Sequence, residues 1–252
     1  MQRIFWILLA ALLLPVAALA PAAAKEVIVS AAPAPNYMAG KLAVRQSYMP
    51  APQVNDGGLP VIGLQRLADY AVQAVSVTGD TRDSARRHDE IYAMIKGAIE
   101  LAKKRGLIEL ATGQLVVEPL TLENYRSLTL TSDGRPDSDM TTFLVKTKLT
   151  KGVDSKAALE RIDAFIKAVP AVGRALMKQT GDLTLSVVSP DQYRGAIIDL
   201  VAADAKATAA RMGPDYAVTI DGLDRPVEWS RASLTDVFLY VPYSYRVVPK
   251  SR

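Results

Sequence analysis

Apolar residues form one continuous run near the start of this 252-residue chain, from Ile4 to Leu14. Arg3 precedes the run and small residues follow it, an order typical of a secretory signal peptide. The run is shorter than the roughly 20 residues that a membrane-spanning helix needs. Small residues permit cleavage after Ala20 or Ala24, but the first site would leave a proline at the new N-terminus, so we favour the second. The sequence therefore predicts a cleaved signal over residues 1–24 and a periplasmic mature chain without a membrane span.

Beyond the signal, apolar and polar residues alternate in several short segments, which is the pattern of strands with one buried face. Val75 and Val77, for example, alternate with a serine and a threonine before Gly79. The last alternating segment contains Pro242, which cannot donate to a ladder, so this strand is expected at an edge or with a bulge. The expected strands cover residues 25–30, 75–79, 108–110, 114–120, 143–149, 183–187, 216–220 and 236–248.

Three longer segments repeat apolar residues at helical spacing. The first helix follows candidate caps at residues 81–84 and ends at Gly106, and the second begins near Asp154 and ends at Pro170. The third begins at Ser189-Pro190-Asp191, with a capping hydroxyl and a proline in the first turn, and ends at Gly213. The faces expected to be buried are Ile91, Ile95, Ala98 and Ala102; Leu159, Ile162, Ile166 and Val169; and the small stripe Ala196, Leu200, Ala203, Ala207 and Ala210, which would lie close to a sheet.

Prolines and glycines recur from Ala31 to about Pro60 without any apolar period, which predicts a loop or an extended arm. The predicted organisation is a short strand plus a Pro-rich arm or linker over residues 25–66, followed by one folded domain over residues 67–249. Helices and strands are mixed without strict alternation. The fold class expected is therefore α+β, with three main helices packed on a largely antiparallel or mixed sheet.

Composition narrows the function classes. Half of the residues are hydrophobic, enough for a sizeable core, and there is no cysteine. An exported form therefore has no disulfide, and a lipid-anchored cysteine, a thiolate metal site and a cysteine nucleophile are excluded. The 30 basic and 26 acidic residues give a formal charge of +4, but the two signs are interleaved along the chain. Nucleic-acid binding is not expected, because it requires a basic stripe on one face.

Residues with catalytic or metal-binding chemistry are few. His88 is the only histidine, and no G-x-S-x-G motif or Gly-rich phosphate loop occurs, so a solvated surface histidine is favoured over a general base. The acidic residues at 133–139 could bind calcium, and those at 221–228 could form a glycosidase acid pair, but polar turns are the favoured interpretation of both segments. Lys103-Lys104-Arg105 is interpreted as complementing the dipole at a helix C-terminus rather than as a phosphate site. We expect no enzyme activity, no cofactor and no metal.

Four aromatic residues gather near the C-terminus: Trp229, Tyr240, Tyr243 and Tyr245. Aromatic residues on strands usually fill a core or pair across strands. Tyr243 and Tyr245 share one face of a strand that contains a proline, and tyrosine is favoured at subunit interfaces. We therefore expect these four residues at a subunit contact.

The late helix, with Asp204-Ala205-Lys206-Ala207 and Ala209-Ala210-Arg211-Met212-Gly213, is Ala-rich and closed by glycine. Together with the strand at Lys25 to Val29 and the elements from Tyr70 to Val248, it resembles the SIMPL-domain family of exported bacterial proteins, which includes periplasmic immunogenic proteins. One departure is the insertion from Ala31 to about Leu67, between two strands that this family joins tightly. The resemblance implies an envelope protein, often oligomeric, without established catalytic residues.

Two functions from different classes follow as expectations. The first is a non-catalytic envelope protein that acts through oligomerisation or contacts with an envelope protein partner, in envelope maintenance or stress tolerance. The alternative is a periplasmic binding or carrier module for a small apolar or envelope-derived ligand, which requires a pocket between the helices and the sheet. A hydrolase is disfavoured by the single histidine and the missing motifs.

Overall fold

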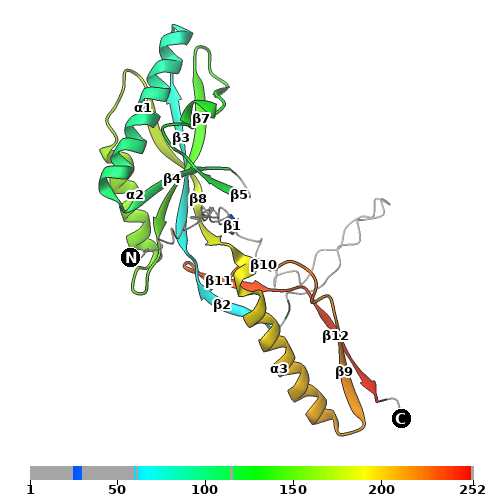
Figure 1. Ribbon diagram of the computed structural model, residues 1–252. Coiled ribbons are helices and arrows are strands. Elements are labelled where there is room, and N and C mark those ends of the chain that lie inside the picture. Colours follow the sequence, from blue (N-terminus) through cyan, green and yellow to red (C-terminus); the bar gives the residue numbers. More distant parts are fainter. Residues whose placement is uncertain (1–24, 30–59, 61, 114–115, 251–252) are drawn as a thin grey trace, which may run out of the picture.

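The structure is a computed structural model that describes residues 25–29, 60, 62–113 and 116–250 (Figure 1). It has the expected α+β class, with three α-helices and antiparallel strand pairs throughout the described residues. The predicted signal and nearly all of the predicted Pro-rich arm lie outside these residues. The strands are β1 Glu26–Val29, β2 Leu64–Leu67, β3 Tyr70–Gly79, β4 Ile108–Thr112, β5 Val116–Pro119, β6 Thr131–Ser132, β7 Asp139–Lys148, β8 Leu176–Val188, β9 Tyr216–Asp221, β10 Glu228–Arg231, β11 Asp236–Tyr240 and β12 Ser244–Pro249. The helices are α1 Ser84–Arg105, α2 Ser155–Ala168 and α3 Arg194–Met212, with 3-10 turns η1 Tyr125–Ser127 and η2 Pro190–Tyr193.

Six strands close into a small barrel, which we call the ring. Their order is β3-β8-β1-β5-β4-β7, and the pairing of β3 with β7 closes the circle, while β6 continues outward from β7. β3 and β7 pair along their whole lengths, from Tyr70 opposite Lys148 to Gly79 opposite Asp139. The long strands β3, β7 and β8 extend beyond the ring, where they form a sheet with two faces.

The first strand completes the ring. All four residues of β1 are buried, and β1 pairs with β8 on one edge and with β5 on the other. The strand predicted at residues 25–30 is therefore confirmed at Glu26–Val29. Its charged member, Glu26, forms an ion pair with Lys146 of β7 inside the ring.

Helices α1 and α2 cover one face of the extended sheet and enclose the main core. Asp83 caps α1 by accepting from the Arg86 amide, and Gly106 ends it in the left-handed conformation at φ 68°. The buried face predicted for this helix is confirmed. The face predicted for α2 is correct at Ile162 and Val169, which are buried. At its other two positions Ala158 and Phe165 are buried in place of Leu159 and Ile166. Burying the large Phe165 ring removes more apolar area from water than either aliphatic side chain.

A second core lies beyond the ring, under the three-stranded sheet β10-β11-β2. The strand β2 falls inside the region predicted as an arm or linker, so that boundary is wrong by a few residues. Its sequence, Leu-Gln-Arg-Leu, lacks the alternation that marks a strand, and the ladder with β11 determines its conformation.

The start and the buried face of the third helix differ from the prediction. Ser189 has φ 46° and no capping hydrogen bond, and the first turn is the 3-10 helix η2. The predicted stripe, including Ala203 and Ala207, is exposed, while Ile197 and Val201 are buried. Because branched aliphatic side chains bury more apolar area than alanine does, they turn toward the second core.

The segment predicted as one strand over residues 236–248 forms two strands in different sheets. β11 ends at Tyr240 and pairs with β10 and β2, whereas β12 begins at Ser244 and pairs with β9. Pro242 lies in the break, where no ladder amide is required. At Pro242 the chain therefore passes from one sheet to another, instead of forming the expected edge strand or bulge.

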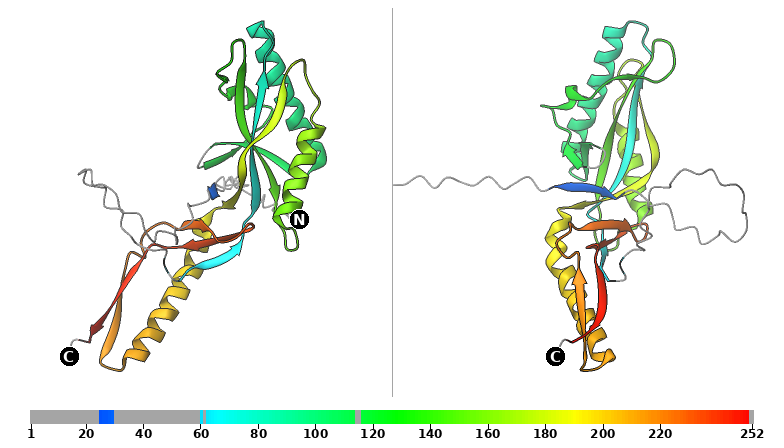
Figure 2. Two further views of the ribbon diagram at one scale, coloured as in Figure 1. Left: turned by 180° about the vertical axis from the view of Figure 1, so that it is seen from behind. Right: turned by 90° about the vertical axis from the view of Figure 1, so that its right-hand side faces the viewer.

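The molecule is elongated, with the ring and helices α1 and α2 at one end (Figures 1 and 2). Helix α3 and the β9–β12 ribbon extend from the second core to the other end, where the chain terminates (Figure 2). Among the described residues, no helix combines the length and apolarity needed to cross a membrane.

Candidate interaction surface

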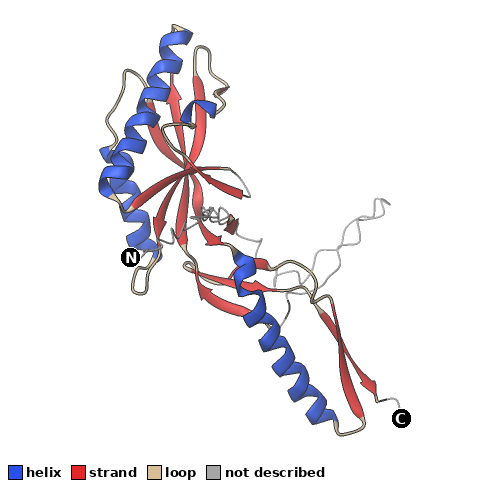
Figure 3. Cartoon of the chain, in the orientation of Figure 1, coloured by secondary structure: helices blue, strands red, loops and turns tan. Residues whose placement is uncertain are grey.

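The end of the molecule that carries α3 has no buried core of its own. We define the distal arm as residues 202–226 and 242–250, which include most of α3 and both strands of the ribbon (Figure 3). Every residue in these ranges is partly or fully exposed. The second core ends next to the arm, at Val201, Val227 and Val241. A two-stranded ribbon beside one helix is marginally stable by itself, which makes the distal arm a candidate interaction surface.

The β9–β12 ribbon has one apolar and one polar face. Residues directly opposite each other in an antiparallel pair lie on the same face, as Tyr245 and Ile220 do. On the other face, Arg246 Nη2 lies 3.3 Å from Asp221 Oδ2, and both side chains are exposed. The apolar face carries Tyr216, Val218, Ile220, Tyr245 and Val247.

Helix α3 covers this apolar face only in part. Burial, together with the negative charge of Asp204 on α3, raises the pKa of Tyr243. Tyr243 stacks on Tyr245, with ring centroids 6.4 Å apart and an interplanar angle of 18°. Tyr245 nevertheless remains 44% exposed and Tyr216 43% exposed. Aromatic area is therefore left accessible on both strands of the ribbon.

The exposed side of α3 carries a row of small and apolar side chains, flanked by the exposed charged residues Asp199, Lys206 and Arg211. Ala203, Ala207 and Ala210 are exposed along it, and Leu200 continues the row toward the ring with 42% exposure. Alanine side chains allow a second helix to approach closely, because they end at Cβ. The stripe predicted to pack on a sheet thus lies on the surface of the described chain.

The structure separates the four aromatic residues predicted at a subunit contact into two pairs. Trp229 is half-buried and donates from Nε1 to the Ile28 carbonyl at 3.2 Å. Tyr240 is 9% exposed and donates to Glu228 Oε2 at 3.1 Å, and burial together with this carboxylate raises its pKa to about 12. Trp229 and Tyr240 therefore support the chain's own fold. Tyr243 and Tyr245 lie on the distal arm.

Sequence reasoning did not assign Tyr216 and Met212 to this surface. Tyr216 is expected only as a strand residue, and Met212 only as the end of a helix. The structure leaves Met212 53% exposed beside the ribbon. The available signal was compositional, because tyrosine and methionine are enriched at interfaces.

His88, which is distant in sequence from the distal arm, forms a hydrogen bond with Asp139. Its Nε2 is 3.0 Å from Asp139 Oδ2, and the imidazole is 45% exposed. Arg87 Nε donates to the same oxygen at 2.6 Å. Asp139 is the only side chain in the described residues that hydrogen-bonds the imidazole, so there is no poised hydroxyl.

The acidic residues weighed as metal or catalytic groups are engaged in pairs and turns. Asp133 binds Arg135, whose hydrogen bond lowers the pKa of the carboxyl to about 2. Asp221 pairs with Arg246 in the ribbon, and Glu228 accepts from a tyrosine. In the part of the chain that the structure describes, no cluster of three acidic or histidine side chains suits a metal ion.

Acid is expected to destabilise the fold through Asp139. Burial disfavours its ionised form, but hydrogen bonds from Arg87 and His88 outweigh burial and lower its pKa. A carboxyl whose folded pKa is below its unfolded value, about 4, stabilises the fold above that pH and loses this contribution as pH falls through the folded pKa. We expect the midpoint temperature of thermal unfolding to decrease as the pH drops below about 4. For Asp139→Asn this temperature should be lower at neutral pH and should decrease less steeply with acid.

The matched control for this experiment is Asp137→Asn. Asp137 is exposed, has φ 54°, which asparagine also tolerates, and forms no ion pair with the described residues. Thermal unfolding followed by circular dichroism from about pH 7 to pH 2 compares the variants. Equal acid slopes for Asp139→Asn and the native chain would show that this carboxyl does not contribute.

Comparisons with known proteins add little to this geometry. Neither a protein-family model nor a curated protein matches the chain. Among solved structures, the chain is similar to an uncharacterized conserved protein from Listeria innocua, at 11% identity, covering 73% of this chain and 92% of that chain. The TM-score is 0.15, which is too low to carry an argument about fold or function. The resemblance to the SIMPL-domain family therefore stays a prediction.

Proposed function

We propose that this protein is an exported envelope protein that works without a catalytic centre, through contacts made by its distal arm. The observation that carries the proposal is the absence of any buried residue in residues 202–226 and 242–250, although these ranges carry aromatic and aliphatic side chains. Contiguous exposed apolar surface on a soluble protein marks an interaction site. The compartment rests on the signal predicted over residues 1–24.

The partner that fits best is a second copy of this chain. The outward face of α3 presents alanine side chains that allow close helix approach, and the same face on another copy is complementary to it in shape. Tyr245, Tyr216 and Met212 supply the residue types that interfaces favour. An envelope protein with a helix of small residues is the second choice. The SIMPL-like character of the chain is part of this proposal, because that resemblance implies assembly.

The carrier alternative has less support in the place where we expected its pocket. The centre of the space between the helices and the sheet is filled, since Ile95, Ile162 and Phe165 have 0% exposure there. Close packing of this kind leaves no room for a ligand at the centre, and a smaller pocket of about 300 Å³ remains where α1 meets β4. A contact function is therefore favoured over a carrier function for the helical side of the molecule.

Substitution of Ala203 and Ala207 by glutamate is expected to abolish self-association. Glutamate favours the helix nearly as strongly as alanine does, so α3 should be preserved. The two substitutions would, however, place two charges in the buried interface. The mature chain, residues 25–252, should sediment as an oligomer at micromolar concentration, and Ala203→Glu/Ala207→Glu should sediment as a monomer. Analytical ultracentrifugation measures both.

The matched control is Ala164→Glu, an exposed alanine on α2 outside the distal arm. This variant should retain the oligomer. A native mature chain that is monomeric at these concentrations would contradict self-association. Loss of the oligomer in the control as well would show that the contact does not involve the arm.

A further inference from the structure

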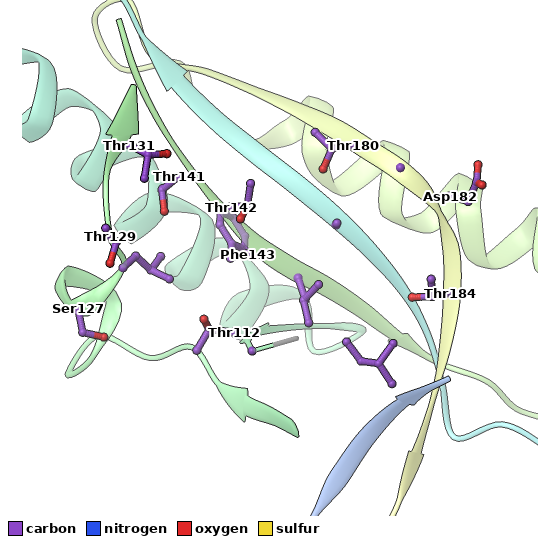
Figure 4. Close-up of a pocket in the computed structure, with 16 residues that line it drawn as sticks. Thr112, Ser127, Thr129, Thr131, Thr141, Thr142, Phe143, Thr180, Asp182 and Thr184 are labelled. Carbon is purple, nitrogen blue, oxygen red and sulfur yellow. The ribbon is translucent and has the colours of Figure 1, made fainter. Parts of the chain in front are cut away.

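A cleft of about 740 Å³ opens at one mouth of the ring (Figure 4), and no residue of the distal arm lines it. Its lining comes from five strands of the ring and from residues 127–131 beside it. Below the cleft the ring is filled by Ile28, Ala111, Val117 and Leu144, which pack together. Mouths of small barrels are frequent ligand sites, and this volume lies within the range of small-molecule pockets.

The lining is rich in hydroxyl groups and almost free of charge. Half of its sixteen residues are threonine or serine, and Asp182 is the one charged side chain among them. None of the described residues that line the cleft is a lysine, arginine or histidine. A carboxylate without a cation disfavours anionic ligands such as phosphates, because bringing two negative charges together costs free energy.

Several of these hydroxyls are available to a ligand. Thr184 donates to the Val72 carbonyl at 3.1 Å and is therefore engaged. In contrast, Thr112, Thr142 and Thr180 make no side-chain hydrogen bond with the described residues. Each free hydroxyl can donate one hydrogen bond and accept others. Figure 4 shows Thr180, Asp182 and Thr184 on one side of the cleft, with Thr129 and Thr131 on the other.

A β-bulge sets the position of the β8 wall. The register between β3 and β8 shifts between Val72 and Ala74, and the buried Gln73 amide fills the bulge. Its Nε2 donates to the carbonyls of Thr180 at 2.9 Å and Gly181 at 3.1 Å. Bulges of this kind redirect side chains next to binding sites. The small side chain of Ala74 leaves the cleft open at this point.

We propose that this cleft binds a neutral, polyhydroxylated ligand of the carbohydrate class. A sugar ring presents C–H groups on its faces and hydroxyls at its edges. The faces fit the apolar floor of Ile28 and Leu144, and the edges fit the threonine hydroxyls and the Asp182 carboxylate. Because each new hydrogen bond replaces one with water, the dissociation constant is expected on the order of 0.1–1 mM.

The test is a nuclear magnetic resonance titration of the isotope-labelled mature chain, residues 25–252. The probes are neutral tetrasaccharides of glucose, mannose and N-acetylglucosamine, a sulfated tetrasaccharide and an uncharged octapeptide. At least one neutral saccharide should shift the amide signals of Thr142 and Gly181, while signals of the distal arm stay unchanged. The sulfated probe and the peptide should cause no shift at equal concentration.

Two variants locate the binding. Thr142→Val/Thr180→Val keeps side-chain volume and favours strand, and it should weaken binding at least about tenfold by removing two hydroxyls. The control Thr219→Val removes an exposed hydroxyl from β9 of the distal arm and should bind as the native chain does. The proposal is overturned if no neutral saccharide binds up to about 10 mM, if the peptide or the sulfated probe binds instead, or if the double variant binds as tightly as the control.

Discussion

Replacement of Lys146 by methionine is expected to lower the free energy of unfolding by about 3–5 kcal/mol. Lys146 Nζ forms an ion pair with Glu26, lies 3.4 Å from Glu109 Oε2 and sits 4.2 Å from the centroid of the Tyr70 ring. Lys146 is 4% exposed and Glu26 is 8% exposed. Removing the ammonium leaves the buried Glu26 carboxylate with one side-chain donor among the described residues, the Ser186 hydroxyl, which donates at 2.5 Å.

The loss should act on the whole ring, because Glu26 lies on the strand that closes it. Tyr70 belongs to the same cluster: burial, with its hydrogen bond to Glu109 at 3.0 Å, raises the pKa of the phenol. The phenol therefore remains a neutral hydrogen-bond donor to more alkaline pH than a solvated tyrosine does. The cluster couples β1, β3, β4 and β7 inside the ring.

Urea unfolding of the mature chain, followed by circular dichroism, measures this effect. The control Lys148→Met, on the same strand but exposed, should change stability by less than about 0.5 kcal/mol. The double variant Glu26→Leu/Lys146→Met should recover most of the loss, because a buried pair can be replaced by apolar side chains. A loss below about 1 kcal/mol for Lys146→Met alone would show that the remaining carboxylate is hydrated.

Gly173→Ala is expected to lower the free energy of unfolding more than alanine does at any described glycine whose Cβ would meet no other atom. Gly173 has φ 55°, and a Cβ there would lie 2.1 Å from the Glu90 carboxyl carbon. The left-handed backbone costs about 1–2 kcal/mol, and crowding adds about 1–3 kcal/mol. Glu90 cannot withdraw freely, since it accepts from Thr81 Oγ1 at 2.5 Å and from the Arg174 amide at 3.1 Å.

Gly152→Ala separates these two contributions. Gly152 also has a positive φ, 88°, but a Cβ there would meet nothing within 4 Å. Alanine at this position should therefore show the backbone strain alone, and chemical denaturation of both variants gives the difference. Equal losses at the two glycines would mean that the Glu90 network adjusts without cost.

Local periodicity was sufficient where an element is buried by its immediate neighbours. The predicted face of α1 is correct because Ile91 and Ile95 repeat at helical spacing and Gly106 supplies a left-handed cap. The strand predicted at residues 75–79 is correct at its end, Gly79, but begins earlier, at Tyr70. Of the candidate site, the sequence placed Tyr243 and Tyr245 on one face of a strand; their rings do stack, although Tyr243 lies in the break before β12.

Other parts of the site depended on contacts between distant segments. Trp229, Tyr240 and Tyr245 are all aromatic, and the sequence does not distinguish them. Trp229 and Tyr240 belong to the sheet that packs on the second core, whereas Tyr245 is exposed. Periodicity alone placed the alanine stripe of α3 inward, since it does not reveal that Ile197 and Val201 compete for the same core. The cleft at the ring was not foreseen, because its threonines come from four separate segments.

Composition and local patterns were enough to predict the fold class, the boundaries of α1, the absence of disulfides and export. Those properties depend on composition or on the spacing of residues within one segment. The closing of the strands into a ring, the change of sheet at Pro242 and the lack of a core in the distal arm became evident from the three-dimensional structure. These features arise from pairing and burial between residues far apart in the chain, such as Glu26 with Lys146, which no local pattern records.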